Sequence, residues 1–266
     1  MKKILILDRR FTRHLLMLLF TATFSLSAAA GNENDTIFYH EKNGTKTYIK
    51  RNSVFKGSKY YSDLFLDFGY NRLDNRNMFT GAGDVSAAGF PKLRNSASKS
   101  FSIYAMFGRK ISGAFSVMSG LGFDWVNYRF SKDVTLREID GYATQVPIAS
   151  VVSNFSYMRK SKLAGSYINV PVLLKIRFHR RFFVAAGVVG GLNIGSHTTV
   201  AFTDKYSNKH SFKNYDIHLA TFRYGYTARA GFSFLSLFAN YYVSPLFSKN
   251  EGPQVYPFAM GIALKL

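Results

Sequence analysis

The chain has 266 residues, no cysteine and a formal net charge of +20 at pH 7. The absence of cysteine excludes a disulfide framework and thiolate chemistry, so a metal site would depend on histidine and carboxylate ligands. Such a basic balance is common in nucleic-acid-binding proteins. The export signal and membrane-type strands described below argue for a different polyanion, the phosphorylated headgroups of lipids.

Residues 1–30 predict a Sec signal peptide, because basic residues precede an apolar run over 15–26 and an Ala28–Ala30 stretch of the A-x-A type. We place cleavage after Ala30, so that the mature chain starts at Gly31 and its charge falls to about +16. The apolar run is too short for a retained membrane helix, and no later segment reaches roughly 18 apolar residues. The pattern therefore argues against a helical membrane protein, and we expect an exported chain.

Residues 31–61 predict an N-terminal extension with one hairpin. Asn43-Gly44 lies between two short apolar segments, 37–39 and 47–49, which is typical of a type I′ turn. A lone two-stranded ribbon is marginal in water. We therefore expect a periplasmic hairpin that docks on the following domain or is partly disordered.

From residue 62 onward, apolar residues alternate with small or polar ones at the two-residue period of a β-strand. We find eight such segments: Ser62–Arg72, Lys99–Arg109, Ala114–Asn127, Gly165–Phe178, Phe182–Ile194, Ile217–Ala230, Leu235–Val243 and Gln254–Leu266. In the clearest, 165–178, six apolar side chains from Ile168 to Phe178 share one face. The pattern predicts an all-β domain over residues 62–266.

The composition of the two faces separates a membrane barrel from a soluble sandwich. One face is continuously aliphatic and aromatic over roughly 9 to 11 residues, the span of a tilted transmembrane strand. The other face is largely small: Gly69, Gly108, Gly120, Gly122, Gly187, Gly191, Gly225 and Gly261 lie on it. Because the interior of an eight-stranded barrel barely holds side chains, we predict an eight-stranded antiparallel up-and-down transmembrane β-barrel.

The connection lengths predict how the barrel is oriented. Links after the second, fourth and sixth strands are short (110–113, 179–181 and 231–234), whereas the others are long and polar. In outer-membrane barrels the short turns face the periplasm and the long loops face outward. We therefore expect both ends of the barrel in the periplasm, with closure between the first and last strands.

The segment Tyr167-Ile-Asn-Val-Pro-Val-Leu-Leu-Lys175 resembles the Tyr-x-x-(Ile/Val)-Pro-x-Leu-Leu-Lys segment of the PorT-like outer-membrane barrels, and the aromatic last strand from Tyr256 is similar to that family's ending. The resemblance covers residues 62–266 and implies an eight-stranded barrel in the outer membrane of a Gram-negative bacterium. The family takes its name from a role in protein secretion. The chain departs from the common barrel pattern by ending in Leu266 instead of Phe.

Ionisable residues occupy the inward positions of several strands: Asp67, Asp124, Lys175, Arg177, Arg223, Arg229 and Lys265. They have two interpretations, a selective aqueous path as in a narrow, porin-like channel, or a salt-bridged plug that fills the barrel. Charges at membrane depth are costly and usually paired. With eight strands we favour the plug.

The sequence offers one local constellation for an enzyme, Asp216-x-His218 at the outer end of the sixth strand. An imidazole oriented by a carboxylate could support hydrolysis. Two polar residues at the membrane interface are the simpler interpretation, so we predict no catalytic residue, cofactor or metal.

The long loops are rich in basic residues: Arg72, Arg76, Lys92, Arg94, Lys132, Arg137, Arg159, Lys160, Lys162, Lys205, Lys209 and Lys213. They are either generic solvated loops or a surface that grips the phosphates of lipopolysaccharide or a ligand. We predict a non-enzymatic protein of the cell outer membrane with a structural or interaction role. Its expected partners are outer-membrane lipid and lipopolysaccharide, or a periplasmic or surface protein, but no nucleic acid.

Overall fold

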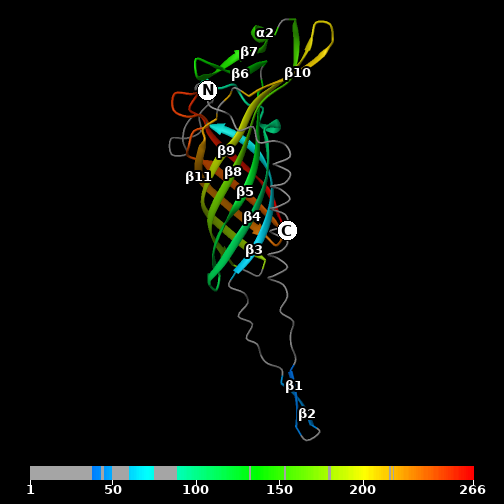
Figure 1. Cartoon of the computed structure of the whole chain (residues 1–266), viewed down its shortest axis with the longest axis vertical. Coiled ribbons are helices and arrows are strands. Elements are labelled where there is room, and N and C mark those ends of the chain that lie inside the picture. The colour runs from blue at the N-terminus through cyan, green and yellow to red at the C-terminus, as the bar shows by residue number, and fades with distance from the viewer. Residues whose placement is uncertain are drawn as a thin grey trace.

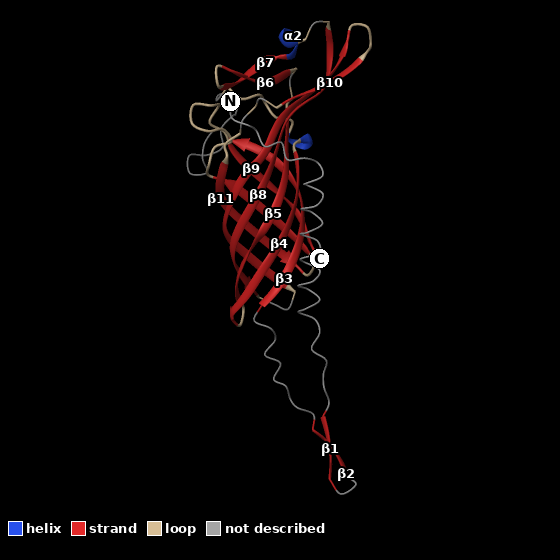
Figure 2. Cartoon of the chain, in the orientation of Figure 1, coloured by secondary structure: helices blue, strands red, loops and turns tan. Residues whose placement is uncertain are grey.

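The computed structural model describes residues 38–42, 45–49, 60–74, 89–131, 133–152, 154–178, 181–215, 217 and 219–266. Most of these residues are in β-strands (Figure 2). The predicted signal peptide, residues 1–30, lies outside the described residues, as does the Asn43-Gly44 turn. Among the described helices, none has the length and hydropathy of a membrane span.

Eight strands form a closed antiparallel barrel in the described part of the chain, which confirms the predicted fold class (Figure 1). They are β3 (Tyr60–Asp74), β4 (Lys99–Ser112), β5 (Phe115–Arg129), β8 (Phe155–Arg177), β9 (Phe182–Asp204), β11 (Phe222–Phe232), β12 (Leu235–Tyr242) and β13 (Tyr256–Lys265). Each strand pairs with its neighbour along the chain, and β13 pairs with β3 from Tyr256↔Asp74 to Lys265↔Phe65. The barrel therefore has up-and-down topology and no open edge.

The predicted alternation determines which side chains face outward. Phe68, Tyr70, Val172 and Leu237 are among the large apolar residues that remain exposed on the outside. Near the long-loop end, the ring of Trp125 stacks on Phe101, with ring centroids 5.8 Å apart. So much exposed apolar surface would be unfavourable in water, at about 25 cal/mol per Å², but is what a lipid-facing barrel surface requires.

Glycines on the inner face make room for large side chains, so the interior is not lined by small residues alone. A Cβ on Gly122 would lie 2.2 Å from the ring of Tyr104, and a Cβ on Gly191 would lie 2.2 Å from Oδ1 of Asn169. Both distances are well below a normal carbon contact. The absent side chains on β5 and β9 therefore allow Tyr104 and Asn169 to reach across the lumen.

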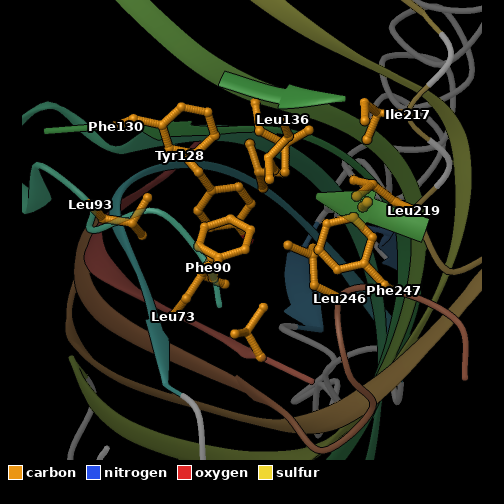
Figure 3. Packing of buried hydrophobic residues seen from close by; sticks show 14 of the residues in the cluster. Leu73, Phe90, Leu93, Tyr128, Phe130, Leu136, Ile217, Leu219, Leu246 and Phe247 are labelled. Carbon is orange, nitrogen blue, oxygen red and sulfur yellow. The ribbon is translucent and has the colours of Figure 1, made fainter. Parts of the chain in front are cut away.

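An apolar cluster closes the long-loop end of the barrel (Figure 3). It combines strand residues such as Tyr128 with loop residues such as Phe90, Ile217 and Phe247, and the three loop side chains are fully buried. Phe90 packs edge-on against Phe130 at 5.9 Å. The loops are thus held over the lumen by a hydrophobic core of their own.

Strands β8 and β9 have 23 residues each and are much longer than the predicted segments 165–178 and 182–194. Their ladder continues beyond the barrel, where β10 (Lys209–Asn214) pairs with β9. We call this β8–β9–β10 extension the outer sheet; it projects from one end of the barrel (Figure 1). The prediction stopped short because a register shift at Ser166/Tyr167 interrupts the alternation without ending the hydrogen bonding.

The remaining elements also lie in connections. β6 (Val134–Ile139) and β7 (Tyr142–Pro147) form a hairpin followed by the short helix α2 (Ile148–Val151), and η2 (Asn95–Ala97) precedes β4. The sixth predicted strand began at Ile217, whereas β11 begins at Phe222. Residues 217 and 219 join the apolar cluster over the lumen instead, so their hydrophobicity reflects the loop core.

Upstream of the barrel, β1 (Phe38–Lys42) pairs with β2 (Thr45–Ile49) in antiparallel register. The ladder runs from Phe38↔Ile49 to Lys42↔Thr45, and the predicted turn residues Asn43-Gly44 between them lie outside the described residues. The division into residues 1–30, 31–61 and 62–266, and a periplasmic role for this hairpin, stay predictions.

Candidate functional site

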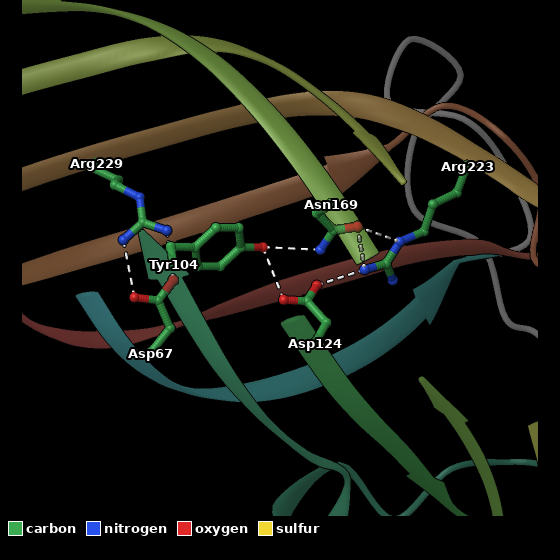
Figure 4. A network of polar contacts seen from close by, with 6 residues as sticks. All are labelled: Asp67, Tyr104, Asp124, Asn169, Arg223 and Arg229. Atoms are coloured by element: carbon green, nitrogen blue, oxygen red, sulfur yellow. Dashed lines mark hydrogen bonds and ion pairs between the residues drawn. The ribbon is translucent and has the colours of Figure 1, made fainter. Parts of the chain in front are cut away.

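Asp67 on β3 and Arg229 on β11 form a buried ion pair across the lumen (Figure 4). The guanidinium donates two hydrogen bonds to the carboxylate, of 2.9 Å and 2.5 Å. The centre of the guanidinium also lies 4.9 Å from the ring centroid of Phe65 and 5.1 Å from that of Tyr104. Bidentate geometry and aromatic contact both suit a buried arginine.

A second network connects four strands nearer the long-loop end (Figure 4). Arg223 donates to Asp124 at 2.5 Å and to the side-chain oxygen of Asn169 at 3.0 Å. The hydroxyl of Tyr104 donates to Asp124 at 2.8 Å and accepts from the Asn169 amide at 3.0 Å. Each of the four side chains therefore contacts at least two others, and the carboxylate is satisfied from both sides.

Arg223 is also held between two aromatic rings. The centre of its guanidinium lies 3.6 Å from the ring centroid of Tyr167 and 4.2 Å from that of Tyr242. Beside it, a cavity of about 10 Å³ is lined in part by Asn71 and Asn240. This space holds about one water molecule, so the lumen is filled by side chains at this level.

A third set of charges lies toward the short-turn end. Asp63 contacts Lys175 at 3.2 Å and Lys265 at 3.1 Å. The Lys175 ammonium lies between the rings of Tyr61 and Phe183, at 4.9 Å and 4.6 Å from their centroids. Lys175 is only 2% exposed, so the Asp63 carboxylate and the two aromatic rings are its immediate surroundings.

The structure buries most of the predicted interior charges, but it leaves Arg177 exposed and Lys265 partly exposed at the short-turn end. Asp67, Asp124, Lys175, Arg223 and Arg229 are all buried. Arg177 occupies the next inward position after Lys175. It is exposed because β8 ends there. Sequence reasoning missed Asp63 as a member of the set, although it lies four residues before Asp67 and on the same face.

The outer sheet has one basic face. Lys162 on β8 and Lys213 on β10 both face Thr199 on β9 in the register, so their side chains share a side of the sheet. Lys160 and Lys209 lie on the same side by the same alternation. The opposite side is apolar and packs against α2 through a small core that includes Ile148, Val200 and Phe202.

The basic face concentrates like charges. Burial, followed by the nearby Lys160 and Lys213, lowers the pKa of Lys162. Burial, followed by Lys213 and Lys162, lowers the pKa of His197. The Lys162 ammonium donates a 2.5 Å hydrogen bond to the Asn127 side chain, which is neutral. The charged groups that lower these two pKa values are all lysines, so positive charge is concentrated on this face.

The enzyme hypothesis gains no support from the geometry of the described residues. Asp216 and His218 lie outside them, as do His179 and Arg180. In the described part of the chain, no three His, Cys, Asp or Glu side chains lie together in a way that could hold a metal ion. Asp204 contacts His210 at 3.1 Å, but its carboxylate also accepts the backbone N–H groups of Tyr206 and Asn208, which is typical of a turn.

The comparison with protein families agrees with this architecture. The family model for the outer membrane protein beta-barrel domain matches residues 64–248. No curated protein matches the chain in sequence. Among solved structures, the chain is similar to Ail, the attachment invasion locus protein of Yersinia pestis, at 12% identity and a TM-score of 0.32, covering 77% of this chain and 97% of that one.

A designed transmembrane beta-barrel has 10% identity and a TM-score of 0.23, with 77% of this chain and 94% of that chain covered. A mutant of the Rh. blastica porin has 10% identity and a TM-score of 0.18, covering 78% and 100% of the two chains. With TM-scores this low, the three solved structures carry no argument about function.

Proposed function

The chain belongs to the outer membrane protein beta-barrel domain family, and from this premise we propose that it is a non-enzymatic, non-conducting barrel that presents its outer sheet to lipopolysaccharide. The protein is an outer-membrane β-barrel protein. The proposal adds to this a closed lumen and a working surface on the basic face of the outer sheet.

The filled lumen supports the non-conducting part of the proposal. Two buried arginines each pair with a carboxylate and stack on aromatic rings, which leaves little space for water between the strands. The apolar cluster lies over the long-loop end of the same lumen. An ion would have to displace paired charges and packed rings to pass, at a cost of several kcal/mol.

The single observation that carries the binding role is the row Lys162–Thr199–Lys213 on the outer sheet. It lies on strands that continue directly from the lipid-facing barrel, beyond the aromatic residues at its long-loop end. In this family that end faces outward, where the phosphates of lipopolysaccharide form the membrane surface. Each lysine near an anionic membrane surface contributes about 1 kcal/mol of attraction.

Binding of lipid A to the refolded full chain in neutral detergent tests this role. We expect Lys162→Gln/Lys213→Gln to weaken binding roughly 30-fold, as two charges of about 1 kcal/mol each predict. Lipid A without its phosphates should bind the original and the variant chains equally weakly. The matched control is Arg109→Gln/Lys110→Gln, which removes the same charge from the short-turn end; equal weakening by this control would refute the proposal.

The alternative function, a narrow channel, is tested by planar-bilayer conductance of the same refolded protein. A plugged lumen predicts no steady single-channel current. A current that Arg223→Gln or Asp67→Asn abolishes or changes in ion selectivity would contradict the plug and favour transport. The role in secretion implied by the PorT-like resemblance has no residue in the described structure that favours it.

A further inference from the structure

The short-turn end of the barrel contains an open pocket that the lumen network does not explain. Its volume is about 330 Å³, and its walls include the cations Lys175, Arg177, Arg181 and Lys265. These residues come from the ends of β8 and β13 and from the connection between β8 and β9. The sequence places Lys175, Arg177 and Lys265 at inward positions, and the barrel adds Arg181 to them at one end.

The charge in this pocket is unbalanced. Within the described residues, Asp63 is the carboxylate that forms ion pairs with this group, and its partners are the two lysines, Lys175 and Lys265. Four positive charges against one negative charge leave a formal excess of three. Lys175 is buried and forms the floor, whereas the Arg177 guanidinium is exposed at the entrance. The pocket therefore has a fixed cationic base and an accessible guanidinium above it.

Backbone hydrogen bonds hold the pocket walls in place. The N–H of Ser233, in the β11–β12 turn, donates to the carbonyl of Arg181 at 2.7 Å. The N–H of Lys265 donates to the carbonyl of Phe234 at 2.7 Å. Two turns and the last strand are thus joined around one cavity, and the cationic groups are attached to an ordered frame.

The pocket opens beside the lipid-facing surface. Phe182 and Phe234 line it and are 40% and 64% exposed, and Leu266 nearby along the chain is 70% exposed. Aromatic residues at a barrel rim mark the level of the lipid headgroups. An anion that enters the pocket from the lipid side would meet cations at the depth where the phosphate of a phospholipid lies.

We propose that this pocket binds the phosphate of an anionic phospholipid headgroup from the inner leaflet of the outer membrane. Guanidinium groups suit phosphate because they donate two parallel hydrogen bonds. Lys175 and Lys265 supply further positive charge, and Ser233 lines the same pocket. A free phosphate ester shares this chemistry, whereas the aromatic rim selects the lipid.

Native mass spectrometry of the refolded full chain tests the proposal. The protein is released from neutral detergent to which phosphatidylglycerol or phosphatidylcholine has been added. We expect selective retention of phosphatidylglycerol and a loss of roughly tenfold or more in its apparent affinity for Arg177→Gln/Arg181→Gln. The charge-matched control, Arg109→Gln/Lys110→Gln at the same end of the barrel but outside the pocket lining, should retain phosphatidylglycerol as the original chain does. Both pairs change surface positions, and circular dichroism verifies that each variant folds.

A competition arm separates the two sources of phosphate. Inorganic phosphate and glycerol phosphate at millimolar concentration should displace little phosphatidylglycerol if the aromatic rim contributes. Displacement at micromolar concentration would overturn the lipid assignment in favour of a soluble phosphate ester. Equal retention of the two lipids, or equal loss in the control variant, would overturn the site itself.

Discussion

The lumen and the outer sheet use the same types of charged side chain in opposite ways. In the lumen, Arg223 and Arg229 are buried, each is paired with a carboxylate, and each is packed against aromatic rings. On the outer sheet, Lys162 and Lys213 face the same side. Burial is the largest cause of the lowered pKa of His197, and the charges of these two lysines lower it further. Charge in the first region is paired within the protein, whereas in the second we propose that an external anion supplies the opposite charge.

This difference predicts that removing a charge is costly in the lumen and nearly neutral on the sheet. Buried ion pairs are a weak source of net stability, but a buried charge whose partner has been removed is strongly destabilising. Exposed charges contribute little to the folded state. Three substitutions, taken from the largest expected effect to the smallest, test this comparison.

Asp67→Ala should destabilise the barrel by about 3 to 5 kcal/mol, because Arg229 would remain buried without its carboxylate. Guanidinium unfolding in detergent, followed by circular dichroism, measures the change. The control is Asp67→Leu/Arg229→Met, which removes both charges and should recover much of the loss. If the double variant were as unstable as the single one, packing and not charge pairing would hold this part of the lumen.

Tyr104→Phe should cost about 1 to 3 kcal/mol, since it removes a hydroxyl that donates to Asp124 and accepts from Asn169 while leaving the ring in place. The same unfolding measurement applies. Phe183→Leu, a change of an apolar lumen residue that takes no part in this network, is the comparison for packing loss alone. An effect of Tyr104→Phe within error of zero would show that the network is not a unit.

Lys213→Gln should change stability by less than about 0.5 kcal/mol, because the side chain is exposed. It should raise the pKa of His197 toward its ordinary value, since the positive charge of Lys213 disfavours protonation of the imidazole. Titration of the histidine resonances by NMR gives the shift, with Lys249→Gln in the β12–β13 connection as the charge-matched control. A pKa that does not move would mean that the basic face is not electrostatically continuous.

The sequence predicts the barrel well because lipid imposes a strict pattern on each strand. Alternation from Tyr167 to Phe178 identifies β8, and short turns identify which ends meet. The sequence analysis did not predict the outer sheet, because its strands do not show the alternation that a lipid-facing strand requires. After the register shift at Ser166/Tyr167, one face is covered by α2 and the other faces water, so the lipid pattern stops while the hydrogen-bonded ladder continues.

The pairings inside the lumen could not be predicted for another reason. Asp67 and Arg229 are 162 residues apart in sequence, and which carboxylate meets which arginine depends on the shear of the closed barrel. Alternation predicts that a side chain points inward, but it does not predict how far along the barrel axis the side chain lies. The same limit explains why Arg177 was grouped with the interior charges and Asp63 was not, although the pairing of β13 with β3 brings Lys265 beside Asp63.

The pairing of β8 with β9 runs from Arg177↔Phe183 in the barrel to Phe155↔Asp204 in the outer sheet and continues through three register shifts. This continuity has a mechanical consequence. No loop separates the two parts along these strands, so the basic face is attached to the barrel by a hydrogen-bonded ladder. The lysine row on the outer sheet is therefore pre-organised, and the protein backbone would lose little conformational entropy when an anion binds there. Its height and its orientation above the bilayer are set when the barrel closes.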